Sequence, residues 1–164
     1  MTLSLPKLSN YLTQLNIEHV QDDALVQFQK TNETQNLTIH CQIRTNCEGN
    51  YLKFFIWTDL NEKIKDLDAK VINSIKDWML HQNFHLKFGV WEYDALSHEN
   101  HFAIEIPYED ASITFEQFAR LLSILEEFEQ EHQGLVNIVK GQSLFTVIEQ
   151  HQIRKIEHLF LQYL

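Results

Sequence analysis

The hydrophobic positions along the chain change their spacing several times, and each change predicts a new element of secondary structure. Between residues 4 and 16, leucines recur every three to four positions, which is the spacing of one helix face. Ser4 is a residue type that caps helices, and Pro6 lies in the first turn, where its missing N–H is not needed. These features predict a first helix.

Three segments with the strand period follow this helix. They cover residues 24 to 28, 36 to 44 and 51 to 57. In the second segment, every other residue is apolar and belongs to one face: Leu37, Ile39, Cys41 and Ile43. The connections between the segments are short and polar, as in hairpins, so we expect an antiparallel meander of three strands.

The second half of the chain returns to helical spacing, alternates again and ends in two helical segments. Helical spacing covers residues 66 to 83, 115 to 133 and 144 to 164, and alternation covers residues 85 to 93 and 101 to 107. The last segment runs to the final residue of the sequence.

Local signals mark both ends of the third predicted helix. Thr114 and Gln117 have the spacing of a capping box, and Gly134 is the residue expected to end the helix. Glu109 and Asp110 precede this helix as adjacent carboxylates. We interpret them as a charged approach to the positive helix end, because acid/base chemistry needs a buried carboxylate and this position is normally hydrated.

The order of predicted elements is α-β-β-β-α-β-β-α-α, which places the chain in the α+β class. We expect a five-stranded antiparallel sheet packed on helices. Residues 1–141 are predicted to form a single domain, and residues 142–164 a C-terminal helical extension packed on that domain or on a partner. Trp57, Trp91 and Tyr93 are out of phase with the inward strand residues, so we expect them on the opposite face, as a docking surface.

Charge narrows the classes of partner. The chain of 164 residues has a formal net charge of −10 and no run of Lys or Arg, whereas nucleic acids and anionic lipids are bound by basic patches. We therefore expect neither nucleic acid nor membrane as a partner. No segment has the length of a membrane span or the pattern of a signal peptide. We expect a cytoplasmic protein in which Cys41 and Cys47 are reduced thiols.

Nine histidines make a metal site the first chemical hypothesis. His81 with His85, and His98 with His101, are close in sequence. The predicted helix ends between His81 and His85, and His98 and His101 flank a hairpin turn. Neither pair therefore fits a helical zinc site. Scattered glycines and the lack of a GxSxG motif argue against a phosphate loop and a nucleophile elbow. We expect no catalytic residue, metal or cofactor; the alternative is a small-ligand sensor or metal-dependent enzyme using histidines and carboxylates near residues 94–101.

Three stretches together resemble the YbjN family, proposed bacterial sensory transduction regulators. They are NFHLKFGVWEY (83–93), IEIPYED (104–110) and ITFEQFARLL (113–122). The positions that match the family pattern are Asn83, Phe84, Pro107, Asp110, Thr114, Phe118 and Leu122. The resemblance covers roughly residues 4–140 and implies a fold similar to type III secretion chaperones, small acidic proteins that are often dimeric and bind other proteins. It brings no catalytic residues, and the segment after Ser143 departs from it.

Pattern, charge and resemblance together favour a non-enzymatic protein-binding module, chaperone-like or regulatory, acting in bacterial signalling or secretion. We expect a homodimer that binds another protein. The residues expected to make these contacts lie on the sheet and on the last helix: Trp57, Trp91, Tyr93, Leu144, Ile148, Ile156, Phe160 and Tyr163. The competing interpretation is that each of them completes the core of the monomer.

Overall fold

The computed structural model describes residues 3–33, 37–45, 51–86, 88–107 and 113–161, with side chains as far as residue 157. In chain order, the elements of this described part are α1 (Leu5–Gln14), β1 (His19–Gln21), β2 (Leu25–Asn32), β3 (Leu37–Thr45), β4 (Tyr51–Thr58), α2 (Leu60–Ile64), α3 (Ala69–His85), β5 (Val90–Tyr93), β6 (Asn100–Pro107), α4 (Phe115–Leu122), α5 (Ile124–Val139) and α6 (Leu144–Leu161).

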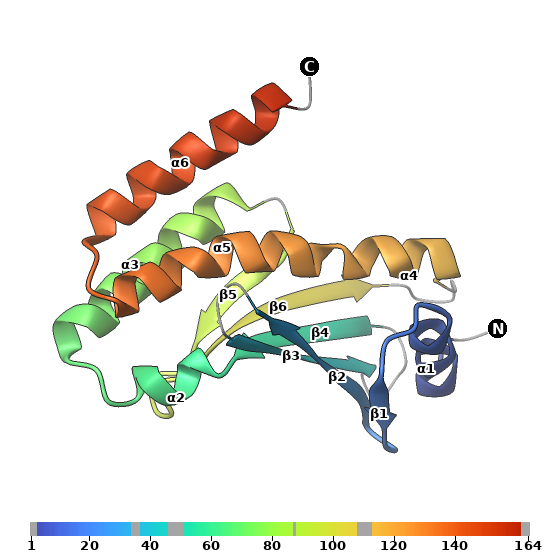
Figure 1. Cartoon of the computed structure of the whole chain (residues 1–164). Coiled ribbons are helices and arrows are strands. Elements are labelled where there is room, and N and C mark those ends of the chain that lie inside the picture. Colours follow the sequence, from blue (N-terminus) through green and yellow to red (C-terminus); the bar gives the residue numbers. More distant parts are fainter. Residues whose placement is uncertain (1–2, 34–36, 46–50, 87, 108–112, 162–164) are drawn as a thin grey trace.

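The described strands form one antiparallel sheet in the order β1-β2-β3-β4-β6-β5. β6 pairs with β4, which leaves β5 as an edge strand (Figure 1). The α+β class and the antiparallel sheet are confirmed, but the prediction of five strands is wrong, because the sheet has six. The additional strand, β1, escapes the sequence pattern because its three residues contain a single aliphatic side chain, Val20.

Helices cover one face of this sheet. In Figure 1, α3, α4 and α5 lie across the upper face, and α6 packs on α3 and α5 on the side away from the sheet. α1 closes one end of this layer, where the ring of Tyr11 lies 5.5 Å from that of Phe118 in α4. The lower face carries none of the long helices of the described chain. The sheet is therefore helix-covered on one side and open on the other.

Inward and outward side chains alternate along the central strands, and the inward ones make the core. In β4, Leu52, Phe54 and Ile56 are at most 1 % exposed, whereas the residues between them are half-buried. Burying a side chain of this size fully contributes about 1.5–3 kcal/mol. Cys41 of β3 is buried in the same layer, as its strand phase predicts, and burial raises the pKa of its thiol. It is a core residue and not a nucleophile.

Of the two predicted ends of the third helix, the start is confirmed and the end is wrong. The capping box is confirmed, because Thr114 Oγ1 accepts a hydrogen bond from the Gln117 N–H while Gln117 Oε1 accepts one from the Thr114 N–H. The helix break falls at Ser123, between α4 and α5. The predicted end at Gly134 is wrong, since α5 continues to Val139.

Gly134 has another role inside α5. A Cβ atom at this position would lie 2.1 Å from the indole ring of Trp78 in α3. The absence of a side chain therefore lets the two helices approach around a tryptophan that is completely buried. The local sequence does not reveal this role of Gly134, because Trp78 lies 56 positions earlier in the chain.

The phase of β5 is opposite to the prediction. The strand begins only at Val90, because α3 and a connection take up the preceding residues, so the alternation read across this segment spans two elements. Trp91 is 3 % exposed on the helix-covered side, whereas Val90 is 39 % exposed. Lys76 of α3 lies 4.6 Å above the ring of Tyr93. The expectation that Trp91 and Tyr93 share the opposite face with Trp57 is therefore wrong.

Candidate functional site

The open face of the sheet collects the outward side chains of β3 and β4. Because side chains alternate along a strand, the residues between the core positions point to this face, where His101 of β6 joins them. We call this set the open-face site: His40, Gln42, Arg44, Lys53, Phe55, Trp57 and His101. The strand register sets His40 opposite Trp57 and Gln42 opposite Phe55.

Stacking and hydrogen bonds fix the position of His40. Its ring stacks on Trp57 with centroids 5.3 Å apart and planes 11° apart. The amide nitrogen of Gln29 lies 3.2 Å from His40 Nδ1, and Asp59 Oδ1 lies 2.6 Å from Nε2. Since Gln29 Nε2 can only donate, Nδ1 accepts and Nε2 donates to Asp59. Both ring nitrogens are therefore occupied, which leaves His40 without a free nitrogen to activate a nucleophile.

The hydrogen bond between His40 and Asp59 also affects the carboxylate of Asp59. The hydrogen bond from His40 is the largest cause that lowers the pKa of Asp59, and Thr38 adds a further hydrogen bond in the same direction. Asp59 thus stays negatively charged at neutral pH, at the end of β4 and directly before α2. It supplies one fixed negative charge at this side of the open-face site.

Two cationic groups and an imidazole ring surround Phe55. Lys53 Nζ lies 4.5 Å and the Arg44 guanidinium 5.3 Å from the centre of its ring, and the His101 ring lies 5.2 Å away. Lys53 is paired with Glu105 at 2.6 Å. Arg44 donates a hydrogen bond to the side-chain oxygen of Gln42 and, among the described residues, has no ion pair within 4 Å. A cation over an aromatic face is stabilised by about 0.5–1 kcal/mol at an exposed site.

Two adjoining hollows occupy this face. The first has a volume of about 560 Å³ and is lined by open-face residues together with Asp59, Asn61, Glu62, Glu99 and Asn100. The second has a volume of about 590 Å³ and extends over β1 and β2. His40 and Trp57 line both. The stacked pair therefore lies where the two hollows adjoin, and we call the two hollows together the groove.

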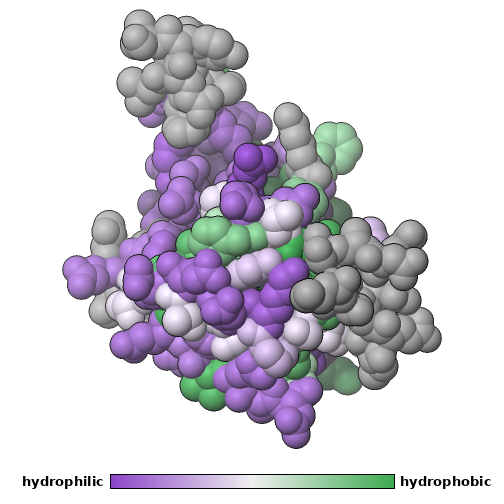
Figure 2. All heavy atoms as spheres, turned by 90° about the vertical axis from the view of Figure 1, so that its right-hand side faces the viewer, coloured by the Kyte–Doolittle hydropathy of each residue, from purple (hydrophilic) through white to green (hydrophobic). Residues whose placement is uncertain are grey.

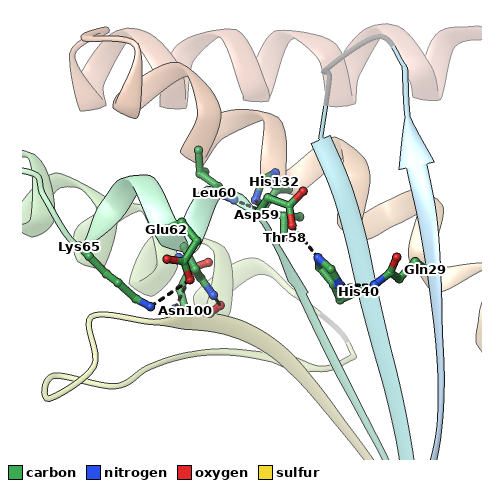
Figure 3. A network of polar contacts seen from close by, with 10 residues as sticks. Gln29, His40, Thr58, Asp59, Leu60, Glu62, Lys65, Asn100 and His132 are labelled. Atoms are coloured by element: carbon green, nitrogen blue, oxygen red, sulfur yellow. Dashed lines mark hydrogen bonds and ion pairs between the residues drawn. The ribbon is translucent and has the colours of Figure 1, made fainter.

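Charge is distributed unevenly along the groove. Asp59, Glu62 and Glu99 gather at the α2 side, where Lys65 lies 3.0 Å from Glu62 and 3.4 Å from Glu99. Arg44 lies at the other end of β3. Figure 3 shows the first part of this arrangement, with Asp59 between His40 and α2 and with Lys65 directed toward Glu62. The groove thus has an acidic end and a basic end.

Buried hydrogen bonds hold the acidic end in place. His132 of α5 contacts the Thr58 hydroxyl at 2.9 Å, and this hydroxyl accepts the first N–H of α2 from Leu60 (Figure 3). Asn61 donates to the Asn100 carbonyl and accepts from the Asn100 N–H, at 2.9 and 3.1 Å. Burial lowers the pKa of His132 to about 3, so its ring is neutral at physiological pH. These contacts tie α2 to β4, β6 and α5.

The residues predicted for partner binding are dispersed over the molecule. Of those whose side chains the structure describes, only Trp57 lies in the groove. Trp91 stacks on Phe128 in the core at 5.3 Å, and Tyr93 is half-buried below α3. On α6, Leu144 and Ile148 are half-buried and pack against the core cluster, while Ile156 is 54 % exposed. The side chains of Phe160 and Tyr163 lie outside the described residues.

Sequence reasoning did not select His40, Arg44 or Phe55. The signal was available, because these residues alternate with the inward residues that define β3 and β4. For these two strands, the alternation correctly predicted which residues point to the helix-covered face. The residues between them must then point to the open face. What the pattern could not provide is the register that stacks His40 on Trp57.

The histidine pairs considered for metal binding are placed differently from the prediction. His81 and His85 both belong to α3, with ring centroids 4.7 Å apart, so the expectation that they fall on different elements is wrong. His98 is bonded to the Tyr93 hydroxyl at 2.6 Å, and His101 to Glu92 at 2.6 Å. Within the described residues, no three His, Cys, Asp or Glu side chains are grouped to hold a metal ion.

The carboxylate pairs carry no sign of acid/base chemistry where they are described. Asp22, Asp23, Glu126 and Glu127 are exposed. Asp22 accepts hydrogen bonds from two backbone N–H groups, and these lower its pKa instead of raising it toward neutrality. The pair at positions 109 and 110 lies outside the described residues.

The fold defines an α+β protein whose antiparallel sheet is covered by helices on one face. A solved structure of this kind is the crystal structure of YbjN, a proposed transcription regulator from E. coli, which aligns with a TM-score of 0.55 over 85% of this chain and 90% of that chain. Sequence identity is 10%, so the likeness shows the fold alone. No family model and no curated protein matches the chain. The YbjN resemblance is thus confirmed at the level of the fold.

Hydropathy gives one further fact about the described helices. None of them combines the length and the apolar character that crossing a lipid bilayer requires.

Proposed function

We propose that the chain is a non-enzymatic, chaperone-like or regulatory module of the bacterial cytoplasm that binds an extended segment of a partner polypeptide on the open-face site. The observation that carries this proposal is the groove of two adjoining hollows on a sheet face that helices leave uncovered. The half-buried ring of Trp57, which lines both hollows, is the kind of aromatic anchor around which polypeptide interfaces are built. The fold shared with YbjN, a proposed regulator, is compatible with this role.

The charges of the groove determine what the partner segment offers. Arg44 presents a guanidinium with no ion pair among the described residues, which suits a partner carboxylate. At the other end, Asp59, Glu62 and Glu99 outnumber the single cation Lys65, so this end suits a basic partner residue. We therefore propose a segment with an acidic residue, an apolar residue over Trp57, and a basic residue in that order across the groove.

A photo-crosslinking experiment on the full chain tests this proposal. A photoreactive phenylalanine analogue placed at Gln42, which lines the first hollow, should form a covalent adduct with a polypeptide in native bacterial cells. The same analogue at Glu127, an exposed residue of α5, is the matched control and should give no such adduct. Peptide mapping of the adduct then shows whether the captured segment has the proposed order of charges.

Two substitutions connect the adduct to the groove. Trp57→Ala and Arg44→Glu should each reduce the adduct yield about tenfold or more, because they remove the apolar anchor and reverse the basic end. Leu96→Ala changes a side chain that is 94 % exposed on the hairpin, outside both hollows, and should leave the yield unchanged. Equal yields from all of these variants, or a segment of the opposite charge order, would overturn the proposed site.

A further inference from the structure

Ser9 and His19 form a hydroxyl–imidazole pair between α1 and β1. Ser9 Oγ lies 2.6 Å from His19 Nε2. The chain reverses between the two residues at Asn16, which follows the end of α1 with a φ of 56° and belongs to a residue type that adopts this conformation readily. β1 therefore lies beside α1 (Figure 1). Because Ser9 and His19 are 10 positions apart, no short sequence motif contains both.

The hydrogen bonds of His19 fix which ring nitrogen carries the proton. Its Nδ1 lies 2.8 Å from the carbonyl oxygen of Ile17. A carbonyl oxygen can only accept, so Nδ1 donates, and in the neutral ring Nε2 has the free electron pair. The Ser9 hydroxyl therefore donates to Nε2. This is the arrangement of a nucleophile, a base that receives its proton, and a third group that orients the base.

The contact and the accessibility of Ser9 set it apart from comparable hydroxyl groups. Inside a helix, a serine hydroxyl can bond the backbone carbonyl four positions earlier, as Ser74 does at 3.2 Å. The Ser9 hydroxyl contacts an imidazole instead. The Thr58 hydroxyl also contacts an imidazole, that of His132, but both of these residues are buried and closed to a reagent. Ser9 and His19 are both half-buried, so a small molecule can reach them.

His19 connects this pair to the second hollow of the groove. It lines the hollow together with the apolar side chains of Val20, Phe28 and Trp57. Ser9 is one hydrogen bond away from this wall. The volume of about 590 Å³ lies in the range of small-molecule sites, roughly 300–1,000 Å³. The hollow therefore has space for a small molecule with an apolar chain, and the Ser9 hydroxyl lies next to its wall.

We propose that Ser9 is a covalent modification site, which takes an acyl group from an activated ester or thioester bound in the second hollow. Ser9 Oγ attacks the carbonyl carbon of the donor while His19 Nε2 receives the hydroxyl proton. The bond from that carbon to the leaving oxygen or sulfur then breaks, and the departing alkoxide or thiolate takes the proton from Nε2. The products are an O-acyl serine and an alcohol or thiol. The acyl group stays on the chain itself, so this reaction does not depend on polypeptide binding.

Acetylation by p-nitrophenyl acetate tests this proposal on the full-length protein. The reaction is stopped with acid at successive times, and peptide mapping by mass spectrometry gives the acetylation rate of each residue. Ser143 is the internal control, because it is exposed and its hydroxyl contacts that of Thr146 instead of a base. Ser9 should be acetylated at least about tenfold faster than Ser143, since a positioned base accelerates such reactions by roughly 10²–10⁴-fold.

Two histidine substitutions test whether His19 is the base. His19→Gln should lower the acetylation rate of Ser9 about a hundredfold and leave the rate of Ser143 unchanged. His98→Gln is the matched control, because His98 is also half-buried and contacts a hydroxyl, that of Tyr93 at 2.6 Å. It should change neither rate. Melting curves followed by circular dichroism establish that both variants are folded. If His19→Gln does not fold, the comparison of Ser9 with Ser143 in the unchanged protein decides.

Two results would overturn the proposal. An acetylation rate of Ser9 that is no higher than that of Ser143 in the unchanged protein would show that the Ser9 hydroxyl is not activated. An unchanged rate of Ser9 in folded His19→Gln protein would show that the imidazole does not receive its proton. Faster acetylation of Ser9 that is lost in His19→Gln and kept in His98→Gln would establish the modification site.

Discussion

Asn83 closes the free edge of the sheet with one side chain. Its amide nitrogen donates to the Trp91 carbonyl at 2.9 Å, and its amide oxygen accepts from the Trp91 N–H at 2.7 Å. These two bonds take the place of a neighbouring strand at the centre of β5, the edge strand of the sheet. Asn83 is also one of the positions that carry the resemblance to the YbjN family. At this position the pattern therefore reflects edge protection and not chemistry.

Replacing Asn83 should destabilise the protein through this edge. Asn83→Leu leaves the Trp91 N–H and carbonyl without their partner, and we expect a loss of about 1–3 kcal/mol in the free energy of unfolding. Asn73→Leu, at an exposed position of the same helix, is the control and should change stability by less than about 0.5 kcal/mol. Urea denaturation followed by circular dichroism measures both. Equal effects of the two substitutions would contradict the role of Asn83.

At the scale of elements, local sequence predicted where the long helices and most strands lie, but it missed the short helix α2 and did not predict how the elements pack together. The capping box at Thr114 is visible because its two partners are three residues apart. The phase of β5 was inverted because periodicity carries across the boundary between α3 and the strand. β1 was missed because its place depends on pairing with β2 and not on its own composition.

The packing of α6 gives a prediction about pH at this scale. Burial is the largest cause that lowers the pKa of His81, and the nearby His85, His151 and Lys155 lower it further, while Glu131 acts in the opposite direction. His81 is therefore neutral in the folded state, and its stabilising contribution is lost as pH falls below the ordinary histidine value of 6.5. At still lower pH the carboxyl of Glu131 is protonated and its contacts with Lys155 and His151 weaken, which also lowers the stability of α6 packing.

Acidification should therefore loosen α6 before the rest of the protein. Hydrogen exchange, corrected for the intrinsic effect of pH, should show lower protection of residues 144–157 at pH 5.5 than at pH 7.5. Protection of α4, which is remote from His81 and Glu131, should fall by less, since it changes only with the stability of the whole fold. His81→Gln removes one titrating group and should reduce the difference. Unchanged protection of α6 across this pH range would show that protonation of His81 does not loosen the packing of α6.

At the scale of the whole molecule, stability should depend on one buried histidine. His132 is 2 % exposed and its pKa is lowered to about 3, so the unfolded chain binds a proton there that the folded chain does not. Below pH 6.5 the free energy of unfolding should fall by up to about 1.4 kcal/mol per pH unit. Urea denaturation at pH 6.5 and pH 5 should thus differ by about 2 kcal/mol.

Two substitutions separate the contribution of His132 from that of the other titrating groups. His132→Gln should reduce the difference between the two pH values, because the buried group no longer titrates. His98→Gln changes a half-buried histidine of the hairpin and should leave the difference in place. A pH dependence that is the same in all three proteins would show that His132 does not control it.

The general form of the molecule was more accessible from sequence than its candidate site. The α+β class follows from periodicity, and the inward faces of β3 and β4 follow from alternation. The groove depends on cross-strand contacts such as His40 on Trp57 and on the buried tie between Asn61 and Asn100, which join segments 17 and 39 positions apart by residue number. No local pattern contains that information.

The three tryptophans occupy three different environments, and this gives the protein an optical reporter of its own groove. Trp78 is completely buried and Trp91 is 3 % exposed, so both emit from an apolar interior, whereas Trp57 is half-buried on the open face beside His40. The water-exposed component of the fluorescence spectrum, and its quenching by iodide, therefore belong to Trp57. Occupation of the groove can be followed by light emission from the unlabelled chain.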